Sequence, residues 1–148
     1  MMGLCLRYAE NEAAAEDMMQ EGWIKVFGNL HSFGFKGSFE GWIKRIMVNT
    51  SLDHLRKNKN HFKQVEIDDS HDVVAPEVSS SDSIAAKDLL KMVQQLPPGY
   101  RTVFNLFAIE GYSHKEIASM LSISENTSKS QYSRGRALLQ RMIQVEFA

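Results

Sequence analysis

The chain has 148 residues, 43% of them hydrophobic and 24% charged, which is typical of a globular protein with one ordinary domain or two small ones. Its formal net charge of −1 gives no sign of nucleic acid, yet residues 31–63 are basic and residues 64–86 acidic, which indicates different partners for different segments. The single cysteine, Cys5, excludes an intrachain disulfide and suits a reducing cytoplasm, and no apolar run is long enough to insert into a membrane.

The first predicted helix is amphipathic and covers roughly residues 12–30. Its acidic start, with Glu12, Glu16 and Asp17, suits a helix N-terminus. Carboxylates beside apolar anchors are typical of protein–protein contacts, and burial in the core is the favoured interpretation for Met18 and Trp23. The apolar residues that recur at helical spacing are Met18, Met19, Trp23, Val26, Phe27 and Leu30.

An aromatic, glycine-containing segment from Leu30 to Gly41 is predicted to be a shaped loop. Aromatic rings stack on unpaired bases with about 1–3 kcal/mol per base. Phe35 and Lys36 are the predicted nucleic-acid ligands of this loop. Three further aromatic residues are predicted with equal weight to be base ligands or core residues: Phe33, Phe39 and Trp42.

A second helix is predicted from about Phe39 to Asn58, and on it Asn49 can pair bidentately with a base edge. Basic residues near its exposed side are candidates for phosphate contacts, which give affinity rather than sequence choice. The alternative for them is a solvated helix end. These residues are Arg45, Arg56, Lys57 and Lys59. The predicted buried side holds Trp42, Ile43, Ile46, Met47, Leu52 and Leu55.

The segment 64–83 has no helical periodicity, contains Pro76 and a serine run, and is acidic. Such a composition cannot bury enough apolar surface to offset the entropy of ordering, so it is predicted to be a flexible linker, with a short strand at Gln64–Ile67 as the alternative. Strand signals are otherwise nearly absent. The chain is therefore predicted to be all-α, with a first lobe at 1–63 and a second lobe at 84–148.

The second lobe is predicted to begin with a helix that Asp82 or Ser83 caps and that Pro97-Pro98 ends. The apolar side of this helix holds Ile84, Leu89, Leu90, Met92, Val93 and Leu96. A further helix is predicted from about Tyr100 to Glu110.

A helix–turn–helix follows and continues in a basic helix to about residue 142. Gly111 can end the preceding helix in a left-handed conformation, and Ser113 with Glu116 forms a capping box for the next one. Ser122 and Ser124 bound a tight turn, and Ser124 can cap the second helix. This motif places its second helix in the DNA major groove. The alternative is an ordinary helical hairpin with a solvated basic face.

No catalytic constellation is evident in the sequence. Asp53-His54 has no nucleophile at an informative spacing, the five histidines are scattered, and no phosphate-binding glycine loop or metal-ligand cluster is present. The chain is therefore not predicted to be an enzyme, and no cofactor or metal is expected.

Three blocks of sequence resemble a known family. Residues 8–27 and 38–56 resemble region 2 of the extracytoplasmic-function (group IV) sigma factors of bacterial RNA polymerase, and residues 96–139 resemble region 4. The resemblance implies a cytoplasmic, nucleoid-associated sigma factor that binds core RNA polymerase and promoter DNA and directs transcription initiation. It leaves open an anti-sigma factor as a further partner.

The resemblance also implies a role for each lobe. The first lobe would bind the clamp helices of the polymerase β′ subunit through Asp17, Gln20, Glu21 and Lys25. It would bind the promoter −10 element, with a flipped base in the aromatic loop, through Phe35, Lys36, Arg45, Asn49, Arg56 and Lys57. The second lobe would bind the β flap, and it would bind the −35 element through Lys115, Thr127, Lys129, Ser130, Gln131 and Arg134. The acidic linker would mimic nucleic-acid charge near the RNA exit path or serve only as a tether.

The chain departs from the family pattern at three positions of the second lobe. Ser122 stands where glycine is frequent, Ser128 where valine is frequent and Gln131 where arginine is frequent. The preference for −35 bases is therefore the least determined property. Family members usually carry about one more helix before the segment that starts at Met1, so we expect either a start assigned too late or a truncation.

Two rival functions share part of this pattern. A response-regulator-type output domain would have the same helix–turn–helix and act without sigma activity, but it would not explain residues 15–27 or the aromatic loop. A polymerase-binding regulator that does not open promoters is the other rival. Transcription with core polymerase separates them from a sigma factor.

Overall fold

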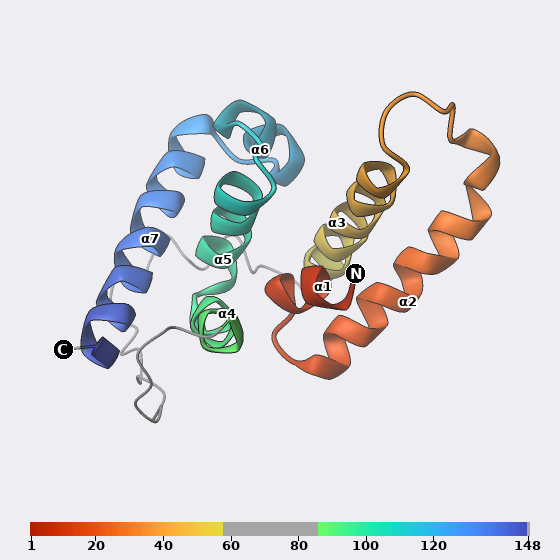
Figure 1. Ribbon diagram of the computed structural model, residues 1–148. Coiled ribbons are helices and arrows are strands. Elements are labelled where there is room, and N and C mark those ends of the chain that lie inside the picture. Colours follow the sequence, from red (N-terminus) through yellow and green to blue (C-terminus); the bar gives the residue numbers. More distant parts are fainter. Residues whose placement is uncertain (58–85, 148) are drawn as a thin grey trace. The chain divides into compact units, whose positions relative to one another are not determined.

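The computed structural model describes residues 1–57 and 86–147 of the chain. Every regular element in these residues is a helix, which confirms the predicted all-α class. The chain divides into two compact units, Met1–Asn60 and His61–Ala148, and each is described by itself (Figure 1). The predicted linker at 64–83, its alternative strand, the cap at Asp82 or Ser83, and Lys59 lie outside the described residues.

Unit 1 is built from three α-helices and one short 3₁₀ turn: α1 (Met2–Tyr8), α2 (Glu12–Gly28), η1 (Leu30–Ser32) and α3 (Phe39–Lys57). Helix α1 has only seven residues, too few to display a periodicity, and the sequence did not predict it. It packs against both α2 and α3 and buries Leu4, Cys5 and Tyr8. Helix α2 begins where the Asn11 side chain accepts a hydrogen bond from the Ala14 amide at 2.8 Å.

The core of unit 1 lies between α2 and α3, which pack along their length. The two helices approach closely because Gly22 lies under Met47, where a Cβ atom would collide with the sulfur. Burial raises the pKa of the Cys5 thiol, and its hydrogen bond with Ser51 lowers the pKa only in part. Two residues predicted for the buried side of α2 are exposed instead, Phe27 at 67% and Leu30 at 43%. Phe27 lies on the side of α2 that faces away from the buried Met18 and Val26, and Leu30 lies beyond the end of the helix at Gly28.

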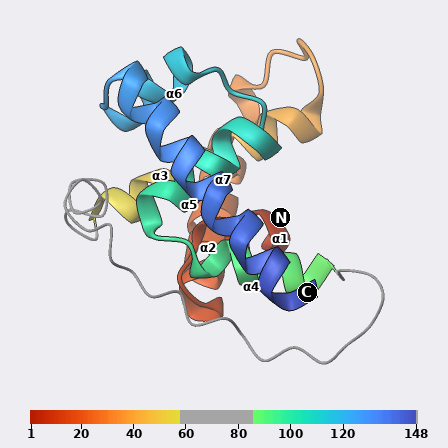
Figure 2. The same ribbon diagram turned by 90° about the vertical axis from the view of Figure 1, so that its left-hand side faces the viewer.

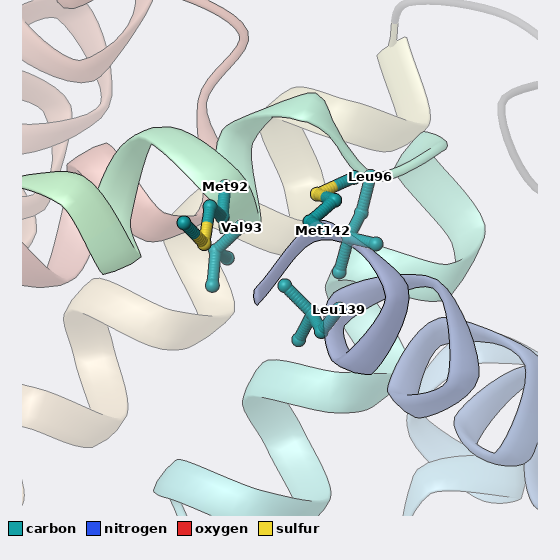
Figure 3. Close-up of a cluster of buried hydrophobic side chains, with 5 residues drawn as sticks. All are labelled: Met92, Val93, Leu96, Leu139 and Met142. Atoms are coloured by element: carbon teal, nitrogen blue, oxygen red, sulfur yellow. The ribbon is translucent and has the colours of Figure 1, made fainter. Parts of the chain in front are cut away.

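Unit 2 contains α4 (Ala86–Gln95), α5 (Pro98–Phe104), a π-helical turn η3 (Asn105–Ile109), α6 (His114–Leu121) and α7 (Glu125–Phe147). Helix α7 contacts α4, α5 and α6, and Figure 2 shows it passing along this group. Its distal half closes a buried cluster of Met92, Val93, Leu96, Leu139 and Met142 (Figure 3). The predicted stop at Pro97-Pro98 is confirmed, but Pro98 itself starts α5 because its missing N–H is not needed in the first turn.

The helix–turn–helix forms through the local chemistry that its sequence predicts. Gly111 adopts φ +82°, and the Ser113 hydroxyl accepts a hydrogen bond from the Glu116 amide at 3.1 Å, so both signals are confirmed. Ser124 caps α7 by accepting from the Thr127 amide at 3.0 Å. Ser122 ends α6 at φ +55°, a left-handed conformation that explains why glycine is the frequent residue there.

Candidate nucleic-acid and protein interfaces

The loop between η1 and α3 is organised by an aromatic cluster. The ring of Phe33 lies 5.2 Å from the rings of Phe35 and Phe39 and 5.4 Å from that of Trp42. Phe39 also stacks on Trp42 at 5.8 Å. Phe33 and Trp42 are half-buried whereas Phe39 is 47% exposed, so the cluster is both a small core and an accessible aromatic surface.

Phe35 is the most accessible aromatic side chain of this cluster. It is 88% exposed and its backbone has φ +53°, which is uncommon for a bulky residue. Strained backbone of this kind persists where the surrounding structure fixes it and occurs often at binding sites. The neighbouring Lys36 is also exposed. The loop therefore presents an aromatic face and a cation to solvent, as stacking on an unpaired base requires.

The outer face of α3 continues from this loop. Arg45, Asn49 and Arg56 are spaced so that they share one side of the helix, and all three are exposed. Trp42 falls on the same side, one turn before Arg45, and Lys57 is exposed at the helix end. The carboxamide of Asn49 is thus available to a base edge and the cations to phosphates.

Asp53 joins two groups of predicted site residues that belong to different helices. One carboxylate oxygen, Oδ1, accepts a hydrogen bond from Arg56 Nη1 at 3.0 Å, and the other, Oδ2, lies 3.5 Å from Lys25 Nζ. All three side chains are nearly half exposed, so each pair contributes only about 0–1 kcal/mol. Lys25 and Arg56 therefore have a structural partner in addition to their predicted external ones. The pairing of Asp53 and Arg56 three residues apart on a helix was readable from the sequence, but the contact between α2 and α3 was not.

The outer face of α2 combines carboxylates with apolar side chains. Asp17 and Gln20 are exposed, and Glu21 is half-buried. One turn further along, Ile24 is 72% exposed and Phe27 67% exposed. Sequence periodicity missed Ile24 because the helix is apolar around most of its circumference. An exposed apolar pair beside acidic and amide groups is typical of a protein–protein contact.

The second helix of the helix–turn–helix is α7, and its structure corrects one predicted DNA contact. Gln131 is only 3% exposed, so its assignment as a base contact is wrong. Thr127 is half-buried and bonded to the cap, with its hydroxyl 2.7 Å from the hydroxyl of Ser124. The Ser130 hydroxyl donates to the Thr127 carbonyl at 3.1 Å.

The three predicted cations of unit 2 are accessible. Lys115 on α6 is exposed, as are Lys129 and Arg134 on α7. Lys129 Nζ lies 3.7 Å from a Glu125 carboxylate oxygen, one turn earlier, in an exposed pair that a phosphate can displace.

A buried polar contact explains the serine at position 128. Ser128 is fully buried, and its hydroxyl lies 2.9 Å from Nδ1 of His114 at the start of α6. The imidazole stacks on Phe107 with ring centroids 4.2 Å apart. Burial lowers the pKa of His114; nearby Lys129 also lowers it. The polar contact between α6 and α7 thus replaces the apolar contact that valine would make.

Neither a metal centre nor a membrane span is present in the described parts of the chain. Residues 1–57 and 86–147 contain no group of three or more His, Cys, Asp and Glu side chains placed to hold a metal ion. Within the same ranges, no helix is both long and apolar enough to cross a bilayer.

Comparison with known families and proteins covers both units. The family model described as Sigma-70 region 2 matches residues 1–61, and that described as Sigma-70, region 4 matches residues 86–139. The chain is 32% identical to the "ECF RNA polymerase sigma factor SigW" of Bacillus subtilis, over 95% of this chain and 81% of that protein. It is 34% identical to the "ECF RNA polymerase sigma factor SigE" of Mycolicibacterium smegmatis, over 92% of this chain and 54% of that one.

A solved structure has a similar fold. It is the sigma factor RpoE from Bartonella quintana, crystallised with the anti-sigma factor NepR. The TM-score is 0.62 at 21% identity, and the match covers 98% of this chain and 90% of that one.

Proposed function

Because the chain belongs to the extracytoplasmic-function group of the sigma-70 family, we propose that the surfaces described above divide the work of a sigma factor between them. The protein is a sigma factor: it binds core RNA polymerase, recognises the −10 and −35 promoter elements and directs transcription initiation. It acts on the polymerase in the cytoplasm, and association with the nucleoid follows from binding promoter DNA. No catalytic activity is needed for this role.

The aromatic loop and the outer face of α3 form the proposed −10 surface of unit 1. The observation that carries this assignment is Phe35, whose 88% exposed ring is held by a left-handed backbone beside the ring of Phe33. Extruding a base costs a few kcal/mol. Stacking of about 1–3 kcal/mol together with polar contacts from Lys36 and Asn49 offsets that cost. Arg45, Arg56 and Lys57 supply the phosphate contacts.

The outer face of α2 is the proposed polymerase surface. Asp17, Gln20 and Glu21 supply polar contacts, as the sequence predicts, and Ile24 and Phe27 add the apolar anchors that such an interface needs. Lys25, which also forms an ion pair with Asp53, contributes a cation to this surface. The β′ clamp helices are the proposed binding partner of this face, and the β flap that of unit 2.

The helix–turn–helix of unit 2 is the proposed −35 surface. Its candidate DNA contacts are Lys115 from α6 and Lys129, Ser130 and Arg134 from α7. Thr127 has a capping role, and Gln131 is no longer a candidate because it is buried. A regulator that acts without sigma activity is not favoured, because its helix–turn–helix alone would leave unit 1 and its family match unexplained. An anti-sigma factor is a further proposed partner, by analogy with the similar solved complex.

A pull-down with core polymerase followed by run-off transcription on genomic fragments tests this division of work. We expect Asn49→Ala to lower promoter-specific initiation at least about fivefold while core binding is unchanged, since a bidentate base contact is worth about 1–3 kcal/mol. Ile24→Ser is the reciprocal variant and should weaken core binding about tenfold, because an isoleucine side chain that becomes buried in the complex contributes about 1.5 kcal/mol or more. Loss of core binding in Asn49→Ala would contradict the role given to α3, and promoter binding without core polymerase would favour the regulator.

A further inference from the structure

We infer that Asn126 on α7 contacts an adenine of the −35 element and sets the base preference of unit 2. The inference rests on the proposed −35 role of the helix–turn–helix and goes beyond it by assigning a base-specific contact. None of the predicted −35 contacts included Asn126.

The burial pattern of α7 first defines which side of the helix can reach DNA. Ser128, Gln131 and Gly135 are buried and fix the inner side. The opposite side holds Asn126, Ser130, Ser133 and Ala137, which follow one another at helical spacing and are all exposed. Three cations flank this row: Lys129 and Arg136 on one side and Arg134 on the other. The short side chains of the row allow a groove floor to come close, and the cations lie where two phosphate backbones would pass.

Position along the helix then selects Asn126 within this row. It is the second residue of α7, directly after Glu125, and the N-terminal residues of a recognition helix are those that contact base edges. Further residues of the row have less capacity for base recognition. Ser130 already donates to the Thr127 carbonyl, Ser133 offers a single hydroxyl, and Ala137 carries no polar group.

The chemistry of the side chain identifies the base. A carboxamide offers one donor and one acceptor side by side, which matches the N7 acceptor and N6 amino donor of adenine in the major groove. Asn126 makes no side-chain hydrogen bond within the described parts of the chain, so both groups are available. Gln131, the other carboxamide in the first two turns, is excluded by its burial.

Transcription from a promoter pool tests this inference. A promoter recovered by run-off transcription on genomic fragments is randomised over its −35 element, and the transcribed templates are sequenced after initiation by core polymerase with the full-length factor. The wild-type factor should enrich adenine at one position by about fivefold to 150-fold, the discrimination of one bidentate contact. Asn126→Ala should lose this enrichment while preferences at the other positions and the salt dependence of promoter binding remain.

Gln140→Ala is the matched control. Gln140 is an exposed carboxamide on the same face of α7, about 21 Å further along the helix, beyond the reach of a recognition helix's base contacts. It should leave all preferences unchanged.

Three outcomes would overturn the inference. They are the absence of an adenine preference in the wild type, its persistence in Asn126→Ala, and a uniform loss of binding at all sequences, which would indicate a phosphate contact at the helix start. The sigma-factor assignment fails separately, if the wild-type factor supports no promoter-specific run-off at all.

Discussion

The buried carboxamide of Gln131 predicts that an apolar replacement stabilises unit 2. Both its Oε1 and Nε2 are buried and have no hydrogen-bond partner among residues 1–57 and 86–147, in a side chain that is 3% exposed. A buried polar group without a partner costs about 1–3 kcal/mol, and replacing it with an apolar group of similar shape removes that cost. Methionine has the same unbranched shape, so Gln131→Met should raise the free energy of unfolding of unit 2 by about 1–2 kcal/mol.

Denaturation of the full chain can assign this gain to unit 2 because the tryptophans divide between the units. Both tryptophans, Trp23 and Trp42, lie in unit 1, so their fluorescence reports on that unit alone, whereas far-ultraviolet circular dichroism follows both. In urea, Gln131→Met should move the midpoint of the circular dichroism transition upward and leave the tryptophan transition in place. For a domain of this size the melting temperature should rise by about 4–8 °C per kcal/mol.

Gln140→Met is the control, since it makes the same chemical change at an exposed position of the same helix and should alter stability by less than about 0.5 kcal/mol. Promoter-specific transcription by Gln131→Met should equal that of the wild type, because a buried side chain does not contact DNA. If Gln131→Met lowered stability, or lost −35-dependent transcription, the side chain would have a partner that the burial argument omits, and the reasoning would be refuted.

Three further predictions concern unit 2. Ser122→Gly should stabilise it by about 0.5–1 kcal/mol, because φ +55° is strained for serine and not for glycine; a lower urea midpoint would contradict this. Gly135→Ala should destabilise unit 2 by about 1–2 kcal/mol, because the new Cβ would lie 3.2 Å from the Tyr100 Cβ and 3.3 Å from the Tyr100 carbonyl oxygen. An unchanged melting temperature would show that α5 and α7 can move apart without cost. Burial lowers the pKa of His114 in the folded state, so below the ordinary value of 6.5 the unfolded chain binds more protons and the free energy of unfolding should fall as pH falls. His114→Phe removes this titrating group and should flatten that part of the pH profile of stability. An equal slope in both proteins would count against the contact of His114 with Ser128.

Much of the fold was predictable from the sequence because the residues that start and end its helices act locally. The capping box of Ser113 and Glu116, the left-handed Gly111 and the proline stop after α4 each depend on residues within one turn of each other, and all three are confirmed. Helix α1 was not predictable because its seven residues carry no periodicity and become helical by packing on α2 and α3.

The accessible and buried sides of the site helices required the tertiary structure. Helical spacing placed Phe27 on the buried side of α2, and the family resemblance placed Gln131 among the DNA contacts of α7; both predictions were wrong. Periodicity gives the relative orientation of residues on a helix, but only the neighbouring helices determine which side is covered. The ion pairs of Asp53 and the contact between His114 and Ser128 likewise join residues far apart in the chain.

The sequence by itself therefore determined the helix–turn–helix, the family and the two functions of promoter and polymerase binding, because caps, turns and motif spacing are properties of short segments. The tertiary structure decided which side chains of those segments face solvent, since burial is a property of packed helices. Burial removed Gln131 from the predicted −35 contacts, and exposure added Asn126 to them and Ile24 and Phe27 to the proposed polymerase surface.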